Sequence, residues 1–326
     1  MRPRIYLTQP VAPSAIERLE KVADLTINSD PLHIATKEEL LKAAREHDII
    51  FCLLHDKIDA DIINANADLK AIASMTITPA DIDTQAATAR KLPVTVIPAL
   101  LLNDATADLA FALLLATVRR VAEGDRVMRS GVFPGSQSNY LESGTVSRKT
   151  LGLIGVGGVG YAMAQRARGF SMPVIYHDPK RLTPDREHEL GATWVPFEQV
   201  FSDADFVSLH VPLTPQTRHL IGAHQLALMK PTAYLINSAR GAVIDELALV
   251  QALKDKRIAG AGLDVFENEP RPHPDLLSMN NVVCTPHMGS AVRELREAMA
   301  NVVVDNILAI LEGKQPPNCW NENIYN

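Results

Sequence analysis

The stretch LGLIGVGGVGYAMAQRARGF, residues 151–170, decides how this chain is interpreted. Its apolar start predicts a buried strand, its glycines a tight turn, and its continuation a helix. Gly155 permits the turn, Gly157 leaves the backbone open to a pyrophosphate, and Gly160 lets helix and strand pack closely. The helix N-terminus then offers N–H groups to phosphates. The stretch predicts a dinucleotide-binding unit, and the alternative is a glycine-rich turn that is packed for structural reasons alone.

An acidic residue follows this unit at the expected place. The next predicted strand, PVIYHD, ends in Asp178, 18 positions after Gly160. A carboxylate there accepts the ribose hydroxyls of NAD and repels the 2′-phosphate of NADP. Lys180 and Arg181 come directly afterwards, and cations at this place could hold that phosphate. The sequence favours NAD and leaves NADP open.

Three polar residues each follow a short apolar segment: Arg240 after AYLINSA, Glu269 after AGLDVFEN and His287 after VVCTP. The carboxyl ends of parallel strands share one edge of a sheet, where open α/β sheets bind ligands. Arginine matches a carboxylate with its planar fork, histidine transfers protons near neutral pH, and a neighbouring glutamate stabilises the imidazolium. The set predicts proton transfer to a keto acid. Taken singly, the residues could be a surface ion pair, a solvated loop acid and a turn residue.

Size and composition narrow the class of protein. The chain has 326 residues, which favours two domains, and a net charge of −6, which argues against nucleic acid or an anionic membrane as partner. The three cysteines form neither a disulfide framework nor a zinc pattern, and we expect no metal. MRPRIYLTQP shows no secretory signal, so we expect a cytoplasmic protein. The apolar run 109–118 is too short to cross a bilayer and predicts a core helix.

Strand-like and helix-like segments alternate along the chain, which predicts parallel sheets covered by helices. A single helix is expected from a cap at Asn103 or Asp104 to Gly131, and a final helix near residues 291–312 precedes an irregular tail. In the first hundred residues, strands are expected at 4–8, 48–54, 69–74 and 94–98, and helices at 15–22, 36–47 and 83–90.

Several longer motifs together resemble the D-2-hydroxyacid dehydrogenase family, and in particular its glyoxylate/hydroxypyruvate reductase branch. The resemblance covers most of residues 100–312 and extends more loosely to FCLLHDKID near the N-terminus. The motifs that carry it are NDATADLAFALLLATVRR (103–120), LGLIGVGGVG (151–160), LHVPLTPQTRHLI (209–221), LINSARGAVID (235–245), AGLDVFENEP (261–270) and TPHMGSA (285–291).

The resemblance implies two doubly wound parallel-sheet domains with a cleft between them. A Rossmann NAD-binding domain would span residues 102–290, and a discontinuous, flavodoxin-like substrate domain would combine residues 1–101 and 291–326. It implies reversible, NAD(H)-dependent reduction of a small 2-keto acid, such as glyoxylate or hydroxypyruvate, to the D-2-hydroxy acid. It also implies a homodimer formed through the cofactor domain and its long helix.

The resemblance implies roles for individual residues. Arg240 would bind the substrate's carboxylate and keto oxygen, His287 would be the acid/base with Glu269 as partner, and Asp264 would contact the nicotinamide carboxamide. The residues expected to bind the cofactor are Thr106, Gly155, Val156, Gly157, Gly158, Val159, Gly160, Asp178, His210, Val211, Pro212, Thr217, Asn237, Ser238, Ala239, Asp264 and Gly289. The residues expected to contact the substrate are Leu53, Leu54, Ile77, Thr78, Arg240 and His287.

One segment departs from the family pattern. A Ser-Val-Gly type turn usually holds the substrate carboxylate on backbone N–H groups, whereas this chain has SMTITPADID, with Ile77 and Thr78 where Val-Gly is expected. Thr78 adds a Cβ, and Pro79 biases it towards an extended conformation. Two rival functions stay open at this point: a phosphite- or sugar-acid-specific dehydrogenase of the same family, and a non-enzymatic NAD-sensing protein that resembles the family's corepressors.

Overall fold

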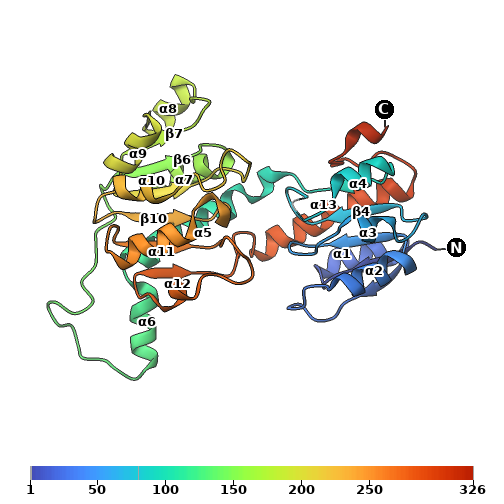
Figure 1. Cartoon of the computed structure of the whole chain (residues 1–326), viewed down its shortest axis with the longest axis horizontal. Coiled ribbons are helices and arrows are strands. Elements are labelled where there is room, and N and C mark those ends of the chain that lie inside the picture. Colours follow the sequence, from blue (N-terminus) through green and yellow to red (C-terminus); the bar gives the residue numbers. More distant parts are fainter. Residues whose placement is uncertain (1, 80, 326) are drawn as a thin grey trace. The chain divides into compact units, whose positions relative to one another are not determined.

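The computed structural model describes residues 2–79 and 81–325. The chain divides into two compact units, Met1–Leu101 with Ala291–Asn326 (unit 1) and Leu102–Ser290 (unit 2) (Figure 1). Each unit contains a parallel sheet, of five strands in unit 1 and seven in unit 2. This confirms the predicted fold class of two parallel-sheet α/β domains.

The sheet of unit 1 has the strand order β2-β1-β3-β4-β5, with every neighbouring pair parallel. This is the flavodoxin-like order predicted for the unit. Its strands are β1 (Arg4–Leu7), β2 (Asp24–Ile27), β3 (Ile49–Cys52), β4 (Ala71–Ser74) and β5 (Val94–Thr95). Its helices are α1 (Pro13–Glu20), α2 (Lys37–Glu46), α3 (Ala60–Asn64), α4 (Thr84–Ala89) and α13 (Arg293–Leu311).

Burial explains which of these elements the sequence predicts. β3 and β4 lie inside the sheet and are buried at every position, and both were expected from their apolar sequences. β2 was missed because its residues, at the sheet edge, are only exposed or half-buried and show no apolar pattern. The five-residue helix α3 was missed as well, although Asp59 caps it through the backbone N–H of Ile62.

The C-terminal tail, expected to be irregular, completes the open edge of the unit 1 sheet. Beyond α13, Val96 donates its N–H to the carbonyl of Asn318 and Trp320 donates to that of Val94. This antiparallel bridge covers β5, and a 3₁₀ turn η3 (Glu322–Tyr325) follows. The amide of the buried Asn321 adds bonds to the N–H of Val94 (2.9 Å) and the carbonyl of Leu92 (2.9 Å).

The sheet of unit 2 has the order β12-β11-β10-β9-β6-β7-β8, again entirely parallel. The order reverses beside β6, which is the switch point where Rossmann-type sheets bind dinucleotides. The strands are β6 (Leu151–Ile154), β7 (Val174–His177), β8 (Ala192–Trp194), β9 (Phe206–Leu209), β10 (Tyr234–Asn237), β11 (Gly260–Leu263) and β12 (Val282–Cys284). The helices are α5 (Asn103–Val118), α6 (Val121–Arg129), α7 (Gly158–Arg168), α8 (Pro184–Leu190), α9 (Phe197–Asp203), α10 (Ala223–Leu228), α11 (Glu246–Lys254) and α12 (Pro274–Ser278), with a 3₁₀ turn η2 (Gly241–Val243).

The single long helix predicted from Asn103 to Gly131 is wrong. The chain forms two helices, α5 and α6, because Arg120 takes the left-handed region at φ +52°. The guanidinium of Arg120 binds Glu123 in the first turn of α6 with an Nε–Oε2 distance of 2.7 Å. The break falls where an apolar, buried sequence gives way to a charged one that buries none of its residues.

The start of this region also differs from the expected cap. A 3₁₀ turn η1 (Ala99–Leu102) leads into α5, and the N-cap position is Leu102, which makes no side-chain cap bond. Neither Asn103 nor Asp104 therefore caps the helix.

One stretch within the described part of the chain, Ala99–Val118, is long and apolar enough to cross a membrane by length and composition alone. Core helices meet the same criteria. α5 packs against α7, β10 and β11 and buries Phe111, Leu113 and Leu114 within unit 2.

Candidate active site

The glycine turn after β6 has the geometry that its sequence predicts. Gly155 takes φ +89°, and a Cβ there would lie 2.6 Å from the carbonyl oxygen of His210. A Cβ on Gly160, in the first turn of α7, would overlap the carbonyl oxygen of Gly155. Only glycine permits this turn and this close contact of helix with strand.

Gly157 needs a different explanation. No described heavy atom lies within 4 Å of the place where its Cβ would be, and α7 begins at the next residue. Open space over a backbone at a helix N-terminus is what an approaching pyrophosphate requires. The turn therefore fits a dinucleotide, with the N–H groups of α7 as the anion-binding donors.

Asn103 was not predicted for this site, yet it lies at the glycine turn. A Cβ on Gly158 would overlap the side-chain amide of Asn103, which reaches over from the first turn of α5. The sequence signal was present but assigned to a helix cap. In the same turn of α5, Thr106 lies beside Gly289, whose Cβ would be 3.4 Å from the Thr106 Oγ1.

Asp178 follows β7 and is held by two backbone donors. Its Oδ2 accepts the N–H of Val156 (3.0 Å), and its Oδ1 accepts the N–H of Lys180 (2.9 Å). The carboxylate is thus tied to the glycine turn itself. This is the place that contacts the adenosine ribose in a Rossmann sheet.

The catalytic candidates follow three neighbouring strands. Arg240 follows β10, Glu269 lies beyond β11, and His287 follows β12. Because β10, β11 and β12 are adjacent and parallel, all three residues emerge at the carboxyl edge of the unit 2 sheet. Within unit 2, the structure therefore brings the predicted set together.

His287 and Glu269 form a direct pair. The imidazole Nδ1 lies 2.7 Å from Oε2 of Glu269, and the side chains are 24% and 15% exposed. Glu269 Oε1 accepts the N–H of Phe266 (3.0 Å), so the carboxylate is fixed on both oxygens. The histidine backbone is in the left-handed region at φ +49°. A carboxylate at Nδ1 fixes the orientation of the ring and directs Nε2 to the other side.

Arg240 is half-buried and is held at its backbone and its guanidinium. Its carbonyl accepts the side-chain amide of Asn237 (3.0 Å), and its Nη1 donates to the carbonyl of Ala239 (2.6 Å). Burial lowers the pKa of Arg240 from its ordinary value, and the charge of Glu269 opposes that shift. A guanidinium stays protonated at any physiological pH, so this is a positive charge in a sheltered place.

Asp264 fastens the segment that carries His287. Its Oδ1 accepts the hydroxyl of Thr285 (2.6 Å) and the N–H of Met288 (2.8 Å), and its Oδ2 accepts the N–H of Gly289 (2.9 Å). Asp264 is 1% exposed, and this burial raises the pKa of its carboxyl. The sequence pointed only to a cofactor contact and missed this fastening role, because the donors lie more than 20 residues away.

The remaining cofactor candidates line the loops after β9 and β10. Burial lowers the pKa of His210 to about 4, and its Nε2 lies 2.9 Å from the hydroxyl of Ser208. The hydroxyl of Thr217 donates to the carbonyl of Pro212 (2.6 Å), which closes the loop that follows Val211. Ser238 is buried, and its hydroxyl has no hydrogen-bond partner among the described residues.

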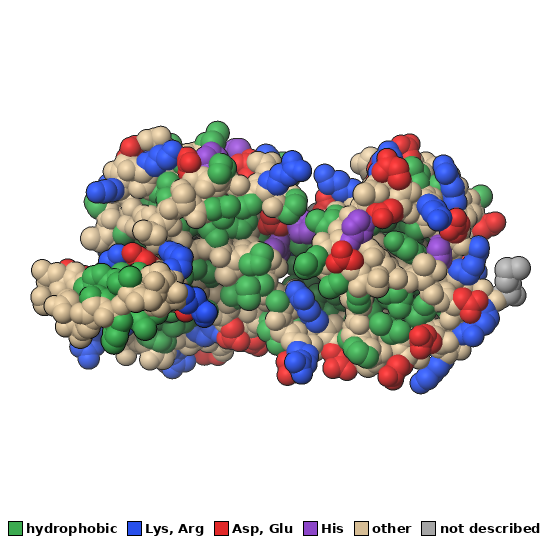
Figure 2. All heavy atoms as spheres, turned by 90° about the horizontal axis from the view of Figure 1, so that it is seen from below, with side chains coloured by type: hydrophobic (Ala, Val, Ile, Leu, Met, Phe, Trp, Pro, Cys, Tyr) green, Lys and Arg blue, Asp and Glu red, His purple; other side chains and the backbone are tan. Residues whose placement is uncertain are grey.

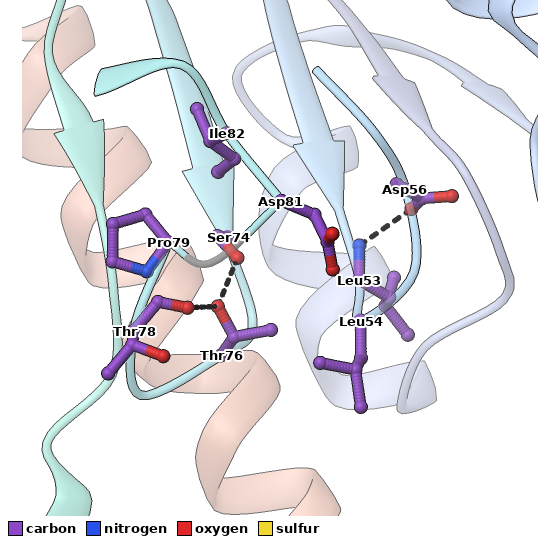
Figure 3. A pocket seen from close by; sticks show the side chains of 9 residues that line it. All are labelled: Leu53, Leu54, Asp56, Ser74, Thr76, Thr78, Pro79, Asp81 and Ile82. Atoms are coloured by element: carbon purple, nitrogen blue, oxygen red, sulfur yellow. Dashed lines mark hydrogen bonds between the residues drawn. The ribbon is translucent and has the colours of Figure 1, made fainter. Parts of the chain in front are cut away.

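Three of the four predicted substrate residues of unit 1 line a pocket in that unit (Figure 3). Leu53, Leu54 and Thr78 line it, and Ile77 does not. The hydroxyl of Thr76 joins Ser74 (2.6 Å) and donates to the carbonyl of Thr78 (2.8 Å). These bonds fix the turn that departs from the family pattern. The rest of the lining is Asp56, Ser74, Thr76, Pro79, Asp81 and Ile82.

Asp56 is a second residue that the sequence did not single out. It is 2% exposed, and its Oδ2 accepts the hydroxyl of Thr8 (2.5 Å) and the N–H of Leu53 (2.8 Å). Burial raises the pKa of this carboxyl, and the Thr8 hydroxyl and the Leu53 N–H oppose the shift. The carboxylate holds the turn after β3 against the end of β1. The motif FCLLHDKID contained the signal, but its partner Thr8 is 48 residues away.

Comparisons with known proteins point to one family. Residues 111–289 match the family model of the D-isomer specific 2-hydroxyacid dehydrogenase NAD binding domain. A glyoxylate reductase of Thermococcus litoralis is 44% identical over 329 residues, which cover 99% of this chain and 98% of that protein. A solved structure from Thermus thermophilus has a TM-score of 0.89 at 40% identity and covers 97% of this chain and 99% of its own.

A third relative was solved with its ligands. It is the NADPH-dependent glyoxylate/hydroxypyruvate reductase of Sinorhizobium meliloti in complex with NADP and malonate, with a TM-score of 0.79 and 31% identity, covering 98% of this chain and 97% of its own. The chain therefore belongs to the D-isomer-specific 2-hydroxyacid dehydrogenase family and is an NAD(P)-dependent oxidoreductase that interconverts a 2-keto acid and a 2-hydroxy acid.

Proposed function

We propose that this enzyme reduces glyoxylate or hydroxypyruvate, with NADH as the preferred donor, and forms the D-hydroxy acid where the product is chiral. The observation that carries the proposal is the His287–Glu269 pair at the edge that also presents Arg240. Glyoxylate reductases about as long as this chain and up to 44% identical to it support the choice of acid.

His287 is the acid/base in this proposal. With Glu269 at Nδ1, the imidazolium form is stabilised, and Nε2 is the atom that delivers the proton to the oxygen of the keto group. When bound, the reduced nicotinamide supplies the hydride that adds to C2 of the acid. In the oxidative direction Nε2 takes the proton back from the hydroxyl.

Arg240 binds the carboxylate and the keto oxygen in this proposal. Its planar fork matches a carboxylate, and its partial burial strengthens the attraction by reducing competition from water. In unit 1, the N–H groups of Ile77 and Thr78 donate to no acceptor among the described residues, and we propose that they also take part in carboxylate recognition. Asp81 in the same pocket lining disfavours a second negative charge on the substrate.

The cofactor preference follows from Asp178 in this proposal. Its two oxygens are already fixed by the N–H groups of Val156 and Lys180, so its charge cannot turn away from the ribose. A fixed carboxylate accepts the 2′- and 3′-hydroxyls of NAD and repels a 2′-phosphate. The other predicted contacts, from Thr106 to Gly289, keep the roles that the sequence analysis gave them.

A matched pair of histidine variants tests the catalytic part. His287→Ala should lose about 10²–10⁴-fold in kcat while NADH still binds, which is the range of general acid catalysis. The control is His219→Ala, which removes a histidine of the same unit that also contacts a glutamate, at 2.6 Å from Glu267. His219→Ala should retain turnover within about twofold. Near-normal turnover in His287→Ala would remove His287 from the mechanism.

A substrate screen tests the rest. We expect oxidation of NADH with glyoxylate and hydroxypyruvate, weaker activity with pyruvate, and a D product by chiral chromatography where the product is chiral. Turnover restricted to phosphite or 2-ketogluconate would favour the rival dehydrogenases. Tight NADH binding without turnover of any acid would favour an NAD-sensing protein.

We also propose a homodimer formed through unit 2. The helix α6 and the segment after it expose large apolar side chains, among them Val121 (57%), Met128 (54%) and Phe133 (76%). Figure 2 shows hydrophobic side chains gathered on this projecting region, bordered by basic ones. Exposed apolar patches of this kind mark protein–protein contacts. Light scattering should give twice the mass of 35.6 kDa, and Phe133→Glu should shift the mass to that of the monomer.

A cytoplasmic location stays a prediction, which cell fractionation tests.

A further inference from the structure

Two cationic residues, Lys180 and Arg181, follow Asp178, and they differ in the contacts that they make. An arginine close to this position is the group that accommodates the 2′-phosphate in NADP-binding Rossmann sheets. Arg181 is three residues beyond Asp178, but its guanidinium is engaged by Glu187 of α8. The Nε lies 2.8 Å from Oε1 and the Nη2 lies 2.9 Å from Oε2, which is a bidentate pair. Lys180, in contrast, has only its backbone N–H engaged by Asp178 in the described contacts.

Glu187 is itself held in place by a buried residue, Tyr176. The hydroxyl of Tyr176, in β7, donates to the same Oε1 at 2.7 Å and accepts the N–H of Leu182 at 2.9 Å. The Tyr176 side chain is fully buried, and the Glu187 side chain is 13% exposed, whereas that of Arg181 is 62% exposed. Arg181, and after it Tyr176, lower the pKa of Glu187 to about 2, so the carboxylate is charged at every physiological pH.

We propose that Glu187 is a specificity-determining residue that holds Arg181 against α8 and withholds it from the 2′-phosphate of NADP. This inference rests on the proposed preference for NAD(H) and adds a second cause to the repulsion by Asp178. Arg181 must break two charge-assisted hydrogen bonds before it can turn towards a phosphate. NADP is then disfavoured for two reasons: Arg181 does not attract its 2′-phosphate, and Asp178 repels it.

A purely structural role is the competing explanation. A surface arginine–carboxylate pair contributes little to stability. Such a pair changes little else if its arginine has no alternative partner. The two explanations therefore differ in what happens to NADPH binding, and not to folding, when the glutamate loses its charge.

The experiment measures the Kd of NADPH and of NADH by the fluorescence of the bound nucleotide, without any keto acid. Because Asp178 repels the 2′-phosphate in the unaltered chain, the variants are built on Asp178→Ser. Glu187→Gln removes the charge but keeps an oxygen that accepts the Tyr176 hydroxyl. The matched control is Glu189→Gln, which makes the same change two residues on in α8, and a third protein combines Glu187→Gln with Arg181→Ala.

On the Asp178→Ser background, Glu187→Gln should tighten NADPH binding about 5–10-fold and leave the Kd of NADH within twofold. Glu189→Gln should give no gain, and Arg181→Ala should abolish the gain of Glu187→Gln. NADPH binding no tighter with Glu187→Gln than with Glu189→Gln would overturn the proposal, and so would a gain that survives Arg181→Ala. Failure of the unaltered chain to bind NADH would instead contradict the proposed function itself.

Discussion

The two units form the same kind of sheet edge, but they differ in how many glycines they contain. Of the 17 glycines, only Gly313 lies in unit 1, which leaves 16 in unit 2. Both units turn their chain at left-handed residues with side chains, such as His55 in unit 1 and Arg120 in unit 2. Unit 2 uses glycine where another atom comes close, as at Gly155 and Gly160. A unit that must bring its backbone up to a large ligand needs such places, whereas a unit that offers side chains to a small one does not.

The units share one device, a buried aspartate behind the carboxyl edge. Asp56 accepts a threonine hydroxyl from the end of the neighbouring strand, and so does Asp264. Asp264 uses both oxygens on three donors and thereby fixes the segment that carries His287. Oδ2 of Asp56 takes two donors and fixes one turn. The residues proposed to react therefore lie on the more firmly fastened edge.

The largest effect is expected where glycine meets backbone. Gly160→Ala should cost more than about 3 kcal/mol of unfolding free energy, because its Cβ would overlap the Gly155 carbonyl, which cannot move independently of the turn. Gly157→Ala should leave the melting temperature nearly unchanged, since its Cβ enters open space, but should weaken NADH binding at least about tenfold. Thermal melts and NADH titrations measure the two effects. A stable Gly157→Ala variant with unaltered NADH affinity would contradict the pyrophosphate site.

The two aspartates come next. Asp264→Ala leaves three donors without an acceptor and releases the segment of His287, so kcat should fall about 10²-fold. Asp56→Ala leaves the hydroxyl of Thr8 and the N–H of Leu53 without their acceptor and should act mainly on the KM of the keto acid, by less than about tenfold. Each should also cost about 2–3 kcal/mol of stability. Steady-state kinetics together with denaturant unfolding separate these effects, and equal losses of kcat would abolish the distinction between the two edges.

Much of this contrast could be predicted from the sequence, because its signals are local. The glycine spacing of residues 155–160 predicts both the turn and the close helix, since φ and the missing Cβ depend on the residue itself. The placement of Arg240 and His287 followed from one rule, that parallel strands end at one edge. Both inferences can be made without knowing which strands are neighbours in the sheet.

The parts that the sequence did not predict are a local break in a helix and contacts between residues far apart along the chain. The break at Arg120 puts a residue with a side chain in the left-handed region, which the pattern of apolar residues does not reveal. The tail looked irregular because Asn321 binds Leu92 and Val94, more than 200 positions away. Asp56 likewise became meaningful only once Thr8 lay beside it.

A smaller effect concerns pH and should be common to both aspartates. Burial raises the folded-state pKa of Asp56 and of Asp264 above the unfolded value near 3.9. The protonated carboxyl is thus favoured by folding, and this stabilisation is complete below the unfolded pKa and is lost as pH rises through the folded one. In Asp56→Asn and Asp264→Asn, which cannot ionise there, the loss of melting temperature relative to the unaltered chain should shrink from pH 4 to pH 7. A gap that widens with pH would reverse the inferred sign.

The smallest effect is expected at the turn that departs from the family pattern. Thr78→Gly restores the usual small residue and should change the KM for glyoxylate only two- to threefold, with kcat unaltered and about 0.5–1 kcal/mol of stability lost to the added backbone freedom. Thr76→Val tests the same turn more strongly, because it removes the hydroxyl that binds Ser74 and the Thr78 carbonyl. It should raise that KM more than Thr78→Gly does. If Thr78→Gly instead changed kcat tenfold, the side chains of unit 1 would act in the reacting geometry itself, and the division of labour between the two edges would have to be abandoned.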